Sequence, residues 1–150
     1  MRRLLAMVAP VVLLIGTATA HAQSRDMTKS LQDFCHTFDT TWNTDGAPAV
    51  GQFFKEDAIL ISPNGAIVKG RAAITDLFRK IYSHGPTTHR CTVESAAASG
   101  DGVWGYGEAT VSGNPASHAR WAAYDIHHDG EWRVQMLAVI PINQAMPTNR

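Results

Sequence analysis

Apolar side chains recur at helical spacing in two stretches of the first half of the chain. The first runs from residue 27 to 43, and its apolar face carries Leu31, Phe34, Cys35, Phe38 and Trp42. The second runs from residue 71 to 82. Pro48, a residue that suits the first turn of a helix, lies before a short apolar stretch between them. The pattern therefore predicts three helices.

The second half of the chain has the composition and turn spacing of strands. Segments near 89–98, 103–112, 118–128 and 131–141 are separated by glycine-containing turns at 100–102, 113–116 and 129–130. Two shorter strands, 58–62 and 67–68, flank a turn at 63–65. Helices followed by consecutive strands indicate an α+β fold, in which three N-terminal helices pack on one face of a curved antiparallel sheet.

The N-terminus has the three-part layout of a secretory signal peptide. Arg2 and Arg3 precede an apolar run over residues 4–15, and small residues follow up to Ala22. We expect cleavage after Ala22, or alternatively after Ala20, and an uncleaved N-terminal anchor is the other interpretation. On the first reading, residues 1–22 are the leader, residues 23–150 form one domain, and the mature protein is periplasmic or secreted.

Charge and cysteine content narrow the classes of partner. Thirteen basic residues balance thirteen acidic ones without a basic cluster, which argues against nucleic acid as a partner. In an oxidising compartment Cys35 and Cys91 could form a disulfide, and two buried free thiols are the alternative. No residue spacing indicates a metal site or a cofactor, and His84, His89 and His118 are expected at the surface.

Turn chemistry predicts which side chains share a face of the late strands. A two-residue turn at Asp129-Gly130 places His127 opposite Trp132 and Asp125 opposite Val134. A symmetric turn at 113–116 would place Asp125 opposite Trp104. The inward set is then Trp104, Tyr106, Glu108, Trp121, Asp125, His127, Trp132 and Met136.

This inward set is unusually polar for a core, because an unpaired charge is costly to bury. A pocket for a small, largely apolar molecule explains it, with either Asp125 or Glu108 kept neutral by its surroundings. A satisfied core network, with Asp125 bonded to Tyr106 or to an indole N–H, is the alternative. The candidate catalytic residues are Asp125, Glu108 and His127. The candidate ligand-binding residues are Trp42, Trp104, Tyr106, Trp121 and Met136.

The opposite face of the same strands is predicted to be small and apolar. It would hold Val103, Gly105, Gly107, Ala109, Val111, Ala122, Tyr124, Ile126, Leu137 and Val139. Such a face suits association with a second copy of the chain, so we expect a homodimer. A monomer with a half-exposed sheet is the alternative.

Residues 42–50, 54–58, 63–65, 70–74 and 124–134 together resemble the SnoaL-like branch of the nuclear transport factor 2-like superfamily. The resemblance implies a cystatin-like cone with one pocket. This fold hosts isomerases, dehydratases, cyclases, epoxide hydrolases and non-enzymatic modules.

Ketosteroid isomerase, a relative in that superfamily, uses an aspartate before a proline, a helix tyrosine and a protonated aspartate. Ser62 and Phe38 occupy the first two positions here, and Asp125 matches the third. The resemblance thus implies that catalysis would use Glu108 or His127 beside Asp125. It also leaves open a non-catalytic binding or assembly module that dimerises through the sheet.

Overall fold

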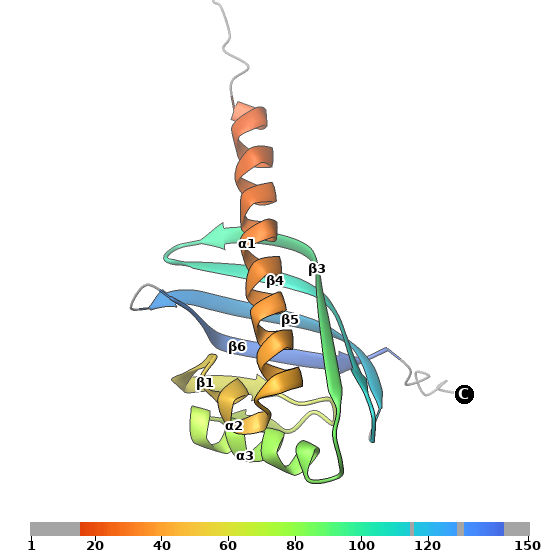
Figure 1. Ribbon diagram of the computed structural model, residues 1–150. Helices are drawn as coiled ribbons and strands as arrows, with labels where there is room; N and C mark the ends of the chain where they lie inside the picture. The colour runs from red at the N-terminus through yellow and green to blue at the C-terminus, as the bar shows by residue number, and fades with distance from the viewer. Residues whose placement is uncertain (1–15, 115, 129–130, 143–150) are drawn as a thin grey trace, which may run out of the picture.

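A computed structural model describes residues 16–114, 116–128 and 131–142 of the chain. Three helices and six strands follow the predicted order (Figure 1). The helices are α1 (Gly16–Thr44), α2 (Ala47–Gly51) and α3 (Arg71–Tyr82). The strands are β1 (Phe54–Ile61), β2 (Ile67–Lys69), β3 (Thr88–Ser99), β4 (Gly102–Ser112), β5 (Ser117–His128) and β6 (Glu131–Pro141).

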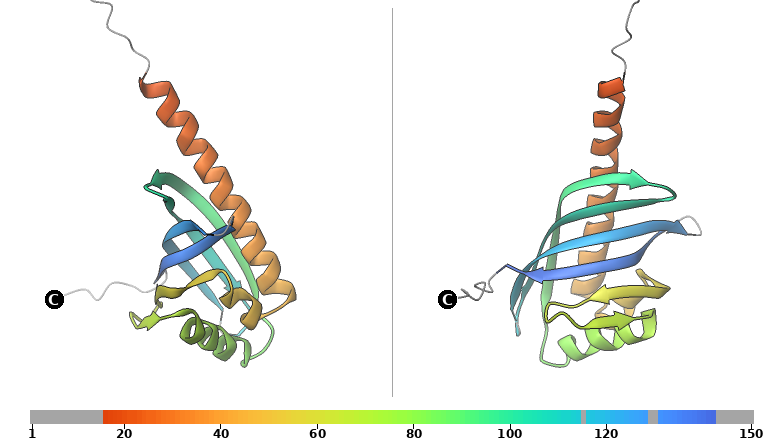
Figure 2. Two further views of the ribbon diagram at one scale, coloured as in Figure 1. Left: turned by 90° about the vertical axis from the view of Figure 1, so that its left-hand side faces the viewer. Right: turned by 180° about the vertical axis from the view of Figure 1, so that it is seen from behind.

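The first helix is longer than its apolar pattern predicts. It begins at Gly16, and its first turns project beyond the sheet in Figures 1 and 2. Residues 1–15 of the predicted leader lie outside the described residues, and the backbone of residues 16–22 belongs to α1. Among the helices that the structure describes, none has an apolar stretch long enough to cross a membrane.

The six strands form one curled sheet in the order β2-β1-β6-β5-β4-β3 (Figure 2). Neighbouring strands are antiparallel except β1 and β6, which are parallel and make the sheet mixed. Because β1 and β6 are far apart in the sequence, no turn signal could reveal their relative direction. The sheet curls around α1, which packs mainly on β3, while α2 and α3 lie at the β1 end.

The predicted register between β4 and β5 is wrong by one residue. Asp125 pairs with Val103, and Trp104 pairs with Tyr124. The reason is the length of the connection. Val111 pairs with Ser117, so five residues, 112–116, follow the last pair, whereas the symmetric turn assumed an even number. A shift of one residue exchanges the two faces of a strand.

The hairpin of β5 and β6 has the predicted register only near its turn. His127 pairs with Trp132 and Asp125 with Val134, as expected. A bulge then shifts the register, so that Tyr124 pairs with Met136 and Ala123 pairs with Leu137 instead of Met136. Met136 therefore lies on the face of the sheet that turns away from α1.

The small and apolar face of β4 packs on α1 instead of lying outside. Gly105 shows this directly, because a Cβ atom at this position would lie 2.2 Å from Leu31 Cδ2. The predicted dimer surface is therefore wrong for β4, whose Val103, Gly105, Gly107, Ala109 and Val111 face inward. Leu137 and Val139 of β6 also line the interior.

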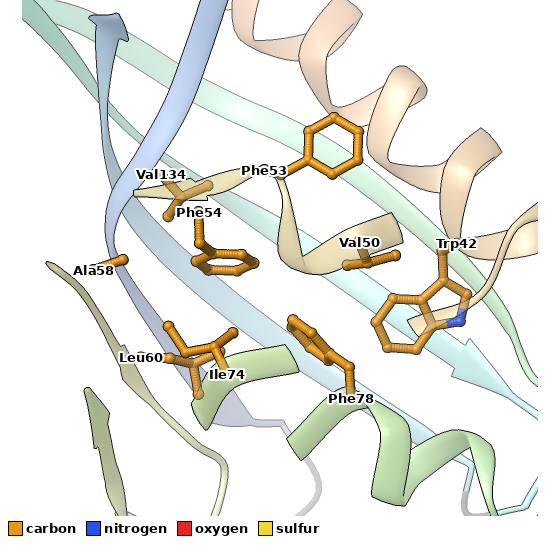
Figure 3. Packing of buried hydrophobic residues seen from close by; sticks show 9 residues of the cluster. All are labelled: Trp42, Val50, Phe53, Phe54, Ala58, Leu60, Ile74, Phe78 and Val134. Atoms are coloured by element: carbon orange, nitrogen blue, oxygen red, sulfur yellow. The ribbon is translucent and has the colours of Figure 1, made fainter. Parts of the chain in front are cut away.

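Two apolar clusters form the core. The larger lies where α2 and α3 cover the β1 end of the sheet (Figure 3). It consists of Trp42, Val50, Phe53, Phe54, Ala58, Leu60, Ile74, Phe78 and Val134. The smaller, between α1 and the strands β3 to β5, consists of Leu31, Cys35, Ala96, Val103 and Trp121. A disulfide joins Cys35 of α1 to Cys91 of β3, with 5.6 Å between their Cα atoms. Of the two alternatives for these cysteines, the structure thus has the bonded pair.

Candidate functional site

An apolar cavity of about 180 Å³ lies between α1, α3 and the inner face of the sheet. Its wall includes aromatic rings from four elements, α1, β1, α3 and β5, among them Phe38, Trp42 and Phe78. Figure 3 shows the side chains of Trp42, from α1, and Phe78, from α3, next to each other, and their ring centroids are 5.3 Å apart. Burying these rings supplies much of the apolar area that stabilises the fold. The same rings give a bound molecule an apolar environment.

Few polar side chains line this cavity. The indole N–H groups of its two tryptophans already donate elsewhere, that of Trp42 to Thr87 Oγ1 (3.2 Å) and that of Trp121 to the Glu108 carbonyl oxygen (3.2 Å). The other polar lining side chains are Ser117, His89 and Asp125. The chemistry that the cavity can offer therefore comes from these three.

Asp125 is the most deeply buried of them, with 1 % of its surface exposed. Asp125 lies between the bulge and the turn of the β5–β6 hairpin, where it pairs with Val134, and its side chain lines the cavity. Neither carboxyl oxygen has a hydrogen-bond partner among the residues that the structure describes. Burial raises the pKa of Asp125 from 3.8 to about 7, because an ionised carboxylate loses its hydration there. Near neutral pH this group can therefore either donate or accept a proton.

The predicted core network around Asp125 is wrong. Tyr106 lies on the other face of the sheet, and the cavity's indole N–H groups bond to Thr87 and to the Glu108 backbone. Buried polar groups are usually paired, so a buried carboxyl without a partner calls for an explanation.

The predicted partnership of Asp125 with Glu108 is also wrong. The one-residue register difference turns Glu108 to the outer face, where its carboxylate lies 3.1 Å from His118 Nε2 and 3.6 Å from Arg120 Nη2. His127 is exposed beside the ring of Trp132, with 5.1 Å between ring centroids, and does not line the cavity. Of the three candidate catalytic side chains, only Asp125 faces the cavity.

The five candidate ligand-binding residues divide between the two faces. Trp42 and Trp121 line the cavity. Trp104 and Tyr106 stack on each other outside, at 44 % and 40 % exposure, and Met136 is 42 % exposed on the same face. The register differences described above account for all three displacements.

His89 faces the cavity, although the sequence places it at the surface. Its Nδ1 lies 2.6 Å from Asp39 Oδ1, and the two side chains are only 11 % and 15 % exposed. A signal for this pair does exist in the sequence. Asp39 follows Cys35 by one helical turn, and His89 precedes Cys91 by two strand positions, so a Cys35–Cys91 bond brings both side chains together.

Metal ligation finds no support in the part of the chain that the structure describes. There, no three His, Cys, Asp or Glu side chains are grouped so that they could hold an ion.

The curled mixed sheet around a long helix is the cystatin-like fold that solved nuclear transport factor 2-like proteins share. A family model of the SnoaL-like domain matches residues 35–135, more than half of the chain. The chain belongs to the SnoaL-like domain family. The comparison with curated proteins gives no match.

Several solved structures share this fold at low sequence identity. A nuclear transport factor 2-like protein from Novosphingobium aromaticivorans is 15 % identical, with a TM-score of 0.65 over 87 % of this chain and 92 % of that one. An uncharacterised protein from Caulobacter vibrioides is 17 % identical, with a TM-score of 0.66 over 79 % and 91 %. A domain of unknown function from Nostoc punctiforme is 15 % identical, with a TM-score of 0.65 over 77 % of both chains. These similarities concern the fold alone.

Proposed function

We propose that the protein binds a small, largely apolar molecule in its cavity and that Asp125 exchanges a hydrogen bond or a proton with that molecule. The observation that carries this proposal is a buried carboxyl group without a protein partner in an apolar cavity. Burial of such a group costs free energy unless something bonds to it. A polar atom of a bound molecule would remove this cost.

The size of the cavity limits the molecule. An engineered apolar cavity of about 150 Å³ accommodates benzene, and the cavity here measures about 180 Å³. A compound with one or two rings therefore fits without rearrangement. Its apolar part would contact the aromatic wall, and its polar atom would lie against Asp125.

Acetophenone and ethylbenzene test the proposal, because both have a phenyl ring with a two-carbon side chain and only acetophenone has a hydrogen-bond acceptor. At pH 5.5 Asp125 is neutral and can donate to the carbonyl group, whereas at pH 8.5 it is ionised and cannot. Calorimetry should show that acetophenone binds roughly three- to tenfold more tightly at pH 5.5 than at pH 8.5, the range expected for one hydrogen bond. Ethylbenzene should depend less on pH.

Asp125→Asn is the control for this experiment, since the variant cannot ionise and should bind acetophenone equally at both pH values. Absence of binding by both compounds would contradict the binding function. Binding of acetophenone that is independent of pH in the wild-type protein would contradict the role of Asp125.

A second candidate function is assembly with a second copy through the outer face of the sheet. Trp104, Tyr124 and Met136 lie side by side there in the strand register, and Tyr106 lies next to Trp104. Monomers seldom expose apolar patches of this kind. Glu108 and Arg120 at one end of the patch offer both signs of charge, which makes that end self-complementary in a two-fold contact.

Light scattering after size exclusion tests this assembly at high micromolar concentration. The wild-type protein should be a dimer, and the double variant Trp104→Ser, Tyr106→Ser should be a folded monomer. A wild-type monomer at that concentration would contradict the assembly and leave the binding proposal intact.

A further inference from the structure

We infer that His89, oriented by Asp39, is a second polar group of the cavity and accepts a hydrogen bond from a hydroxyl group of the bound molecule. This inference rests on the binding function proposed above and specifies the class of ligand. The ligand would be a small apolar molecule that carries a hydroxyl group, such as a phenol or an alcohol.

The two oxygens of Asp39 have separate partners. Oδ1 lies 2.6 Å from His89 Nδ1, and Oδ2 accepts the backbone N–H of Cys91 at 3.0 Å. Because a carboxylate oxygen only accepts, the ring proton of a neutral His89 belongs on Nδ1. The Nε2 atom is then an acceptor, and the carboxylate that fixes this tautomer is itself held in place.

The imidazole ring is also fixed in position. It packs against the rings of Phe38 and Trp42, at centroid distances of 5.2 Å and 4.9 Å. The side-chain amide of Asn43 bonds twice to the backbone of His89, accepting its N–H at 2.7 Å and donating to its carbonyl oxygen at 3.1 Å. A ring that packs against two aromatic side chains and is held at its backbone is preorganised for one interaction.

The Nε2 atom is the remaining polar atom of this arrangement. It has no hydrogen-bond partner among the described residues, and Nδ1 on the other side of the ring is taken up by Asp39. His89 lines the cavity, so a hydroxyl group there can donate to Nε2. A hydroxyl that donates to an aspartate-oriented histidine is also placed to lose its proton to it.

His89 and Asp125 lie at different places on the cavity wall. His89 pairs with Val111 of β4 and Asp125 with Val103. At about 3.3 Å per residue this separates them by up to roughly 26 Å along the strand, and by less in a straight line because the sheet curls. The two groups therefore offer polar contacts at separate positions along the cavity wall.

A pair of probes tests the inference. 4-Methylphenol carries a hydroxyl donor, and 4-methylanisole has the same ring with the donor replaced by a methoxy group. Calorimetry should give roughly three- to tenfold tighter binding of 4-methylphenol to the wild-type protein, the range expected for one hydrogen bond. His89→Phe should abolish this preference while binding of 4-methylanisole persists.

Asp39→Asn is the sharper variant, because it retains the shape of the side chain and reverses the tautomer. The single amide oxygen is needed by the Cys91 N–H, so the NH₂ group faces Nδ1 and moves the ring proton to Nε2. The preference for 4-methylphenol should then disappear. Asp33→Asn on the exposed side of α1 is the matched control and should retain it.

Nitrogen-15 NMR of the wild-type protein reads the tautomer without any variant. It should show the proton on Nδ1 and a change at Nε2 when 4-methylphenol is added. A proton on Nε2, or a preference for 4-methylphenol that survives both His89→Phe and Asp39→Asn, would overturn the inference and leave the cavity as a binding site. Failure of both probes to bind would overturn the proposed function as well.

Discussion

Replacing Asp125 by asparagine removes the charge of the most deeply buried ionisable group in the described part of the chain and retains its shape. The pKa of Asp125 is about 7 in the folded protein and near 3.8 without burial. The folded state therefore holds one more proton than the unfolded state between about pH 4 and pH 7. By linkage, this group makes the fold less stable as the pH rises through that interval, and the loss is complete above about pH 7.

The size of the effect follows from the two pKa values. A change of one in pKa corresponds to about 1.4 kcal/mol, so the rise from 3.8 to about 7 amounts to roughly 4 kcal/mol. At pH 8.5 Asp125→Asn should thus be more stable than the wild-type protein by up to roughly 4 kcal/mol. At pH 4 the two proteins should be nearly equal, because both side chains are then largely neutral.

Urea denaturation from pH 4 to pH 9, with the disulfide oxidised, measures the free energy of unfolding of both proteins. The difference between them isolates Asp125, because the other titrating groups are common to both. The matched control is Asp33→Asn on the exposed surface of α1, which should change stability by less than about 0.5 kcal/mol. Carbon-13 NMR of the Asp125 carboxyl group reports its pKa directly.

A stability difference between wild-type and Asp125→Asn that stays constant from pH 4 to pH 9 would refute this reasoning. So would a carboxyl titration near pH 4. Either result would mean that the carboxylate is solvated or paired in solution, and the acid–base role of Asp125 would lose its basis.

Three further measurements test other parts of the structure. Replacing Cys35 and Cys91 by serine should lower the free energy of unfolding in urea by about 2–5 kcal/mol, because the bond closes a long loop of the unfolded chain. An equal urea midpoint in the variant would contradict a stabilising disulfide between α1 and β3. Gly105→Ala should lower stability by roughly 1–3 kcal/mol because its Cβ would overlap Leu31, and a variant with unchanged melting temperature would be inconsistent with β4 packing on α1. N-terminal sequencing of the protein from the periplasm of an expressing bacterium should begin after Ala22 or Ala20, whereas an intact chain in the membrane fraction would support the uncleaved anchor.

The fold could be predicted from the sequence because its signals are local. Helical spacing identified α1 and α3, and glycine-containing turns bounded strands β3 to β6 within one or two residues. The start of α1 and the parallel pairing of β1 with β6 could not be predicted. The first had no apolar periodicity to mark it, and the second joins segments without a connecting turn.

The site was predictable only close to a well-defined turn. Asp125 lies four residues before the turn predicted at Asp129-Gly130, and the register expected from that turn holds at Asp125. Glu108 lies one hairpin further back, beyond a connection whose length the sequence does not specify, so a single extra residue inverted its face. The pair of Asp39 and His89 depends on a contact between α1 and β3, which the sequence marks only through the Cys35–Cys91 bond, one of the two alternatives for these cysteines.

The parallel pairing of β1 with β6 also bears on the order in which the chain can fold. Phe54 and Val134, partners in this pair, are 80 positions apart, whereas β3, β4, β5 and β6 join their neighbours through short hairpins. Closing the long loop costs more conformational entropy than closing a hairpin, so the meander can form first and β1 joins it afterwards. While β6 is still inside the ribosome, Phe54 has no strand partner, so the part of the cavity wall that Phe54 forms is completed only after β6 emerges.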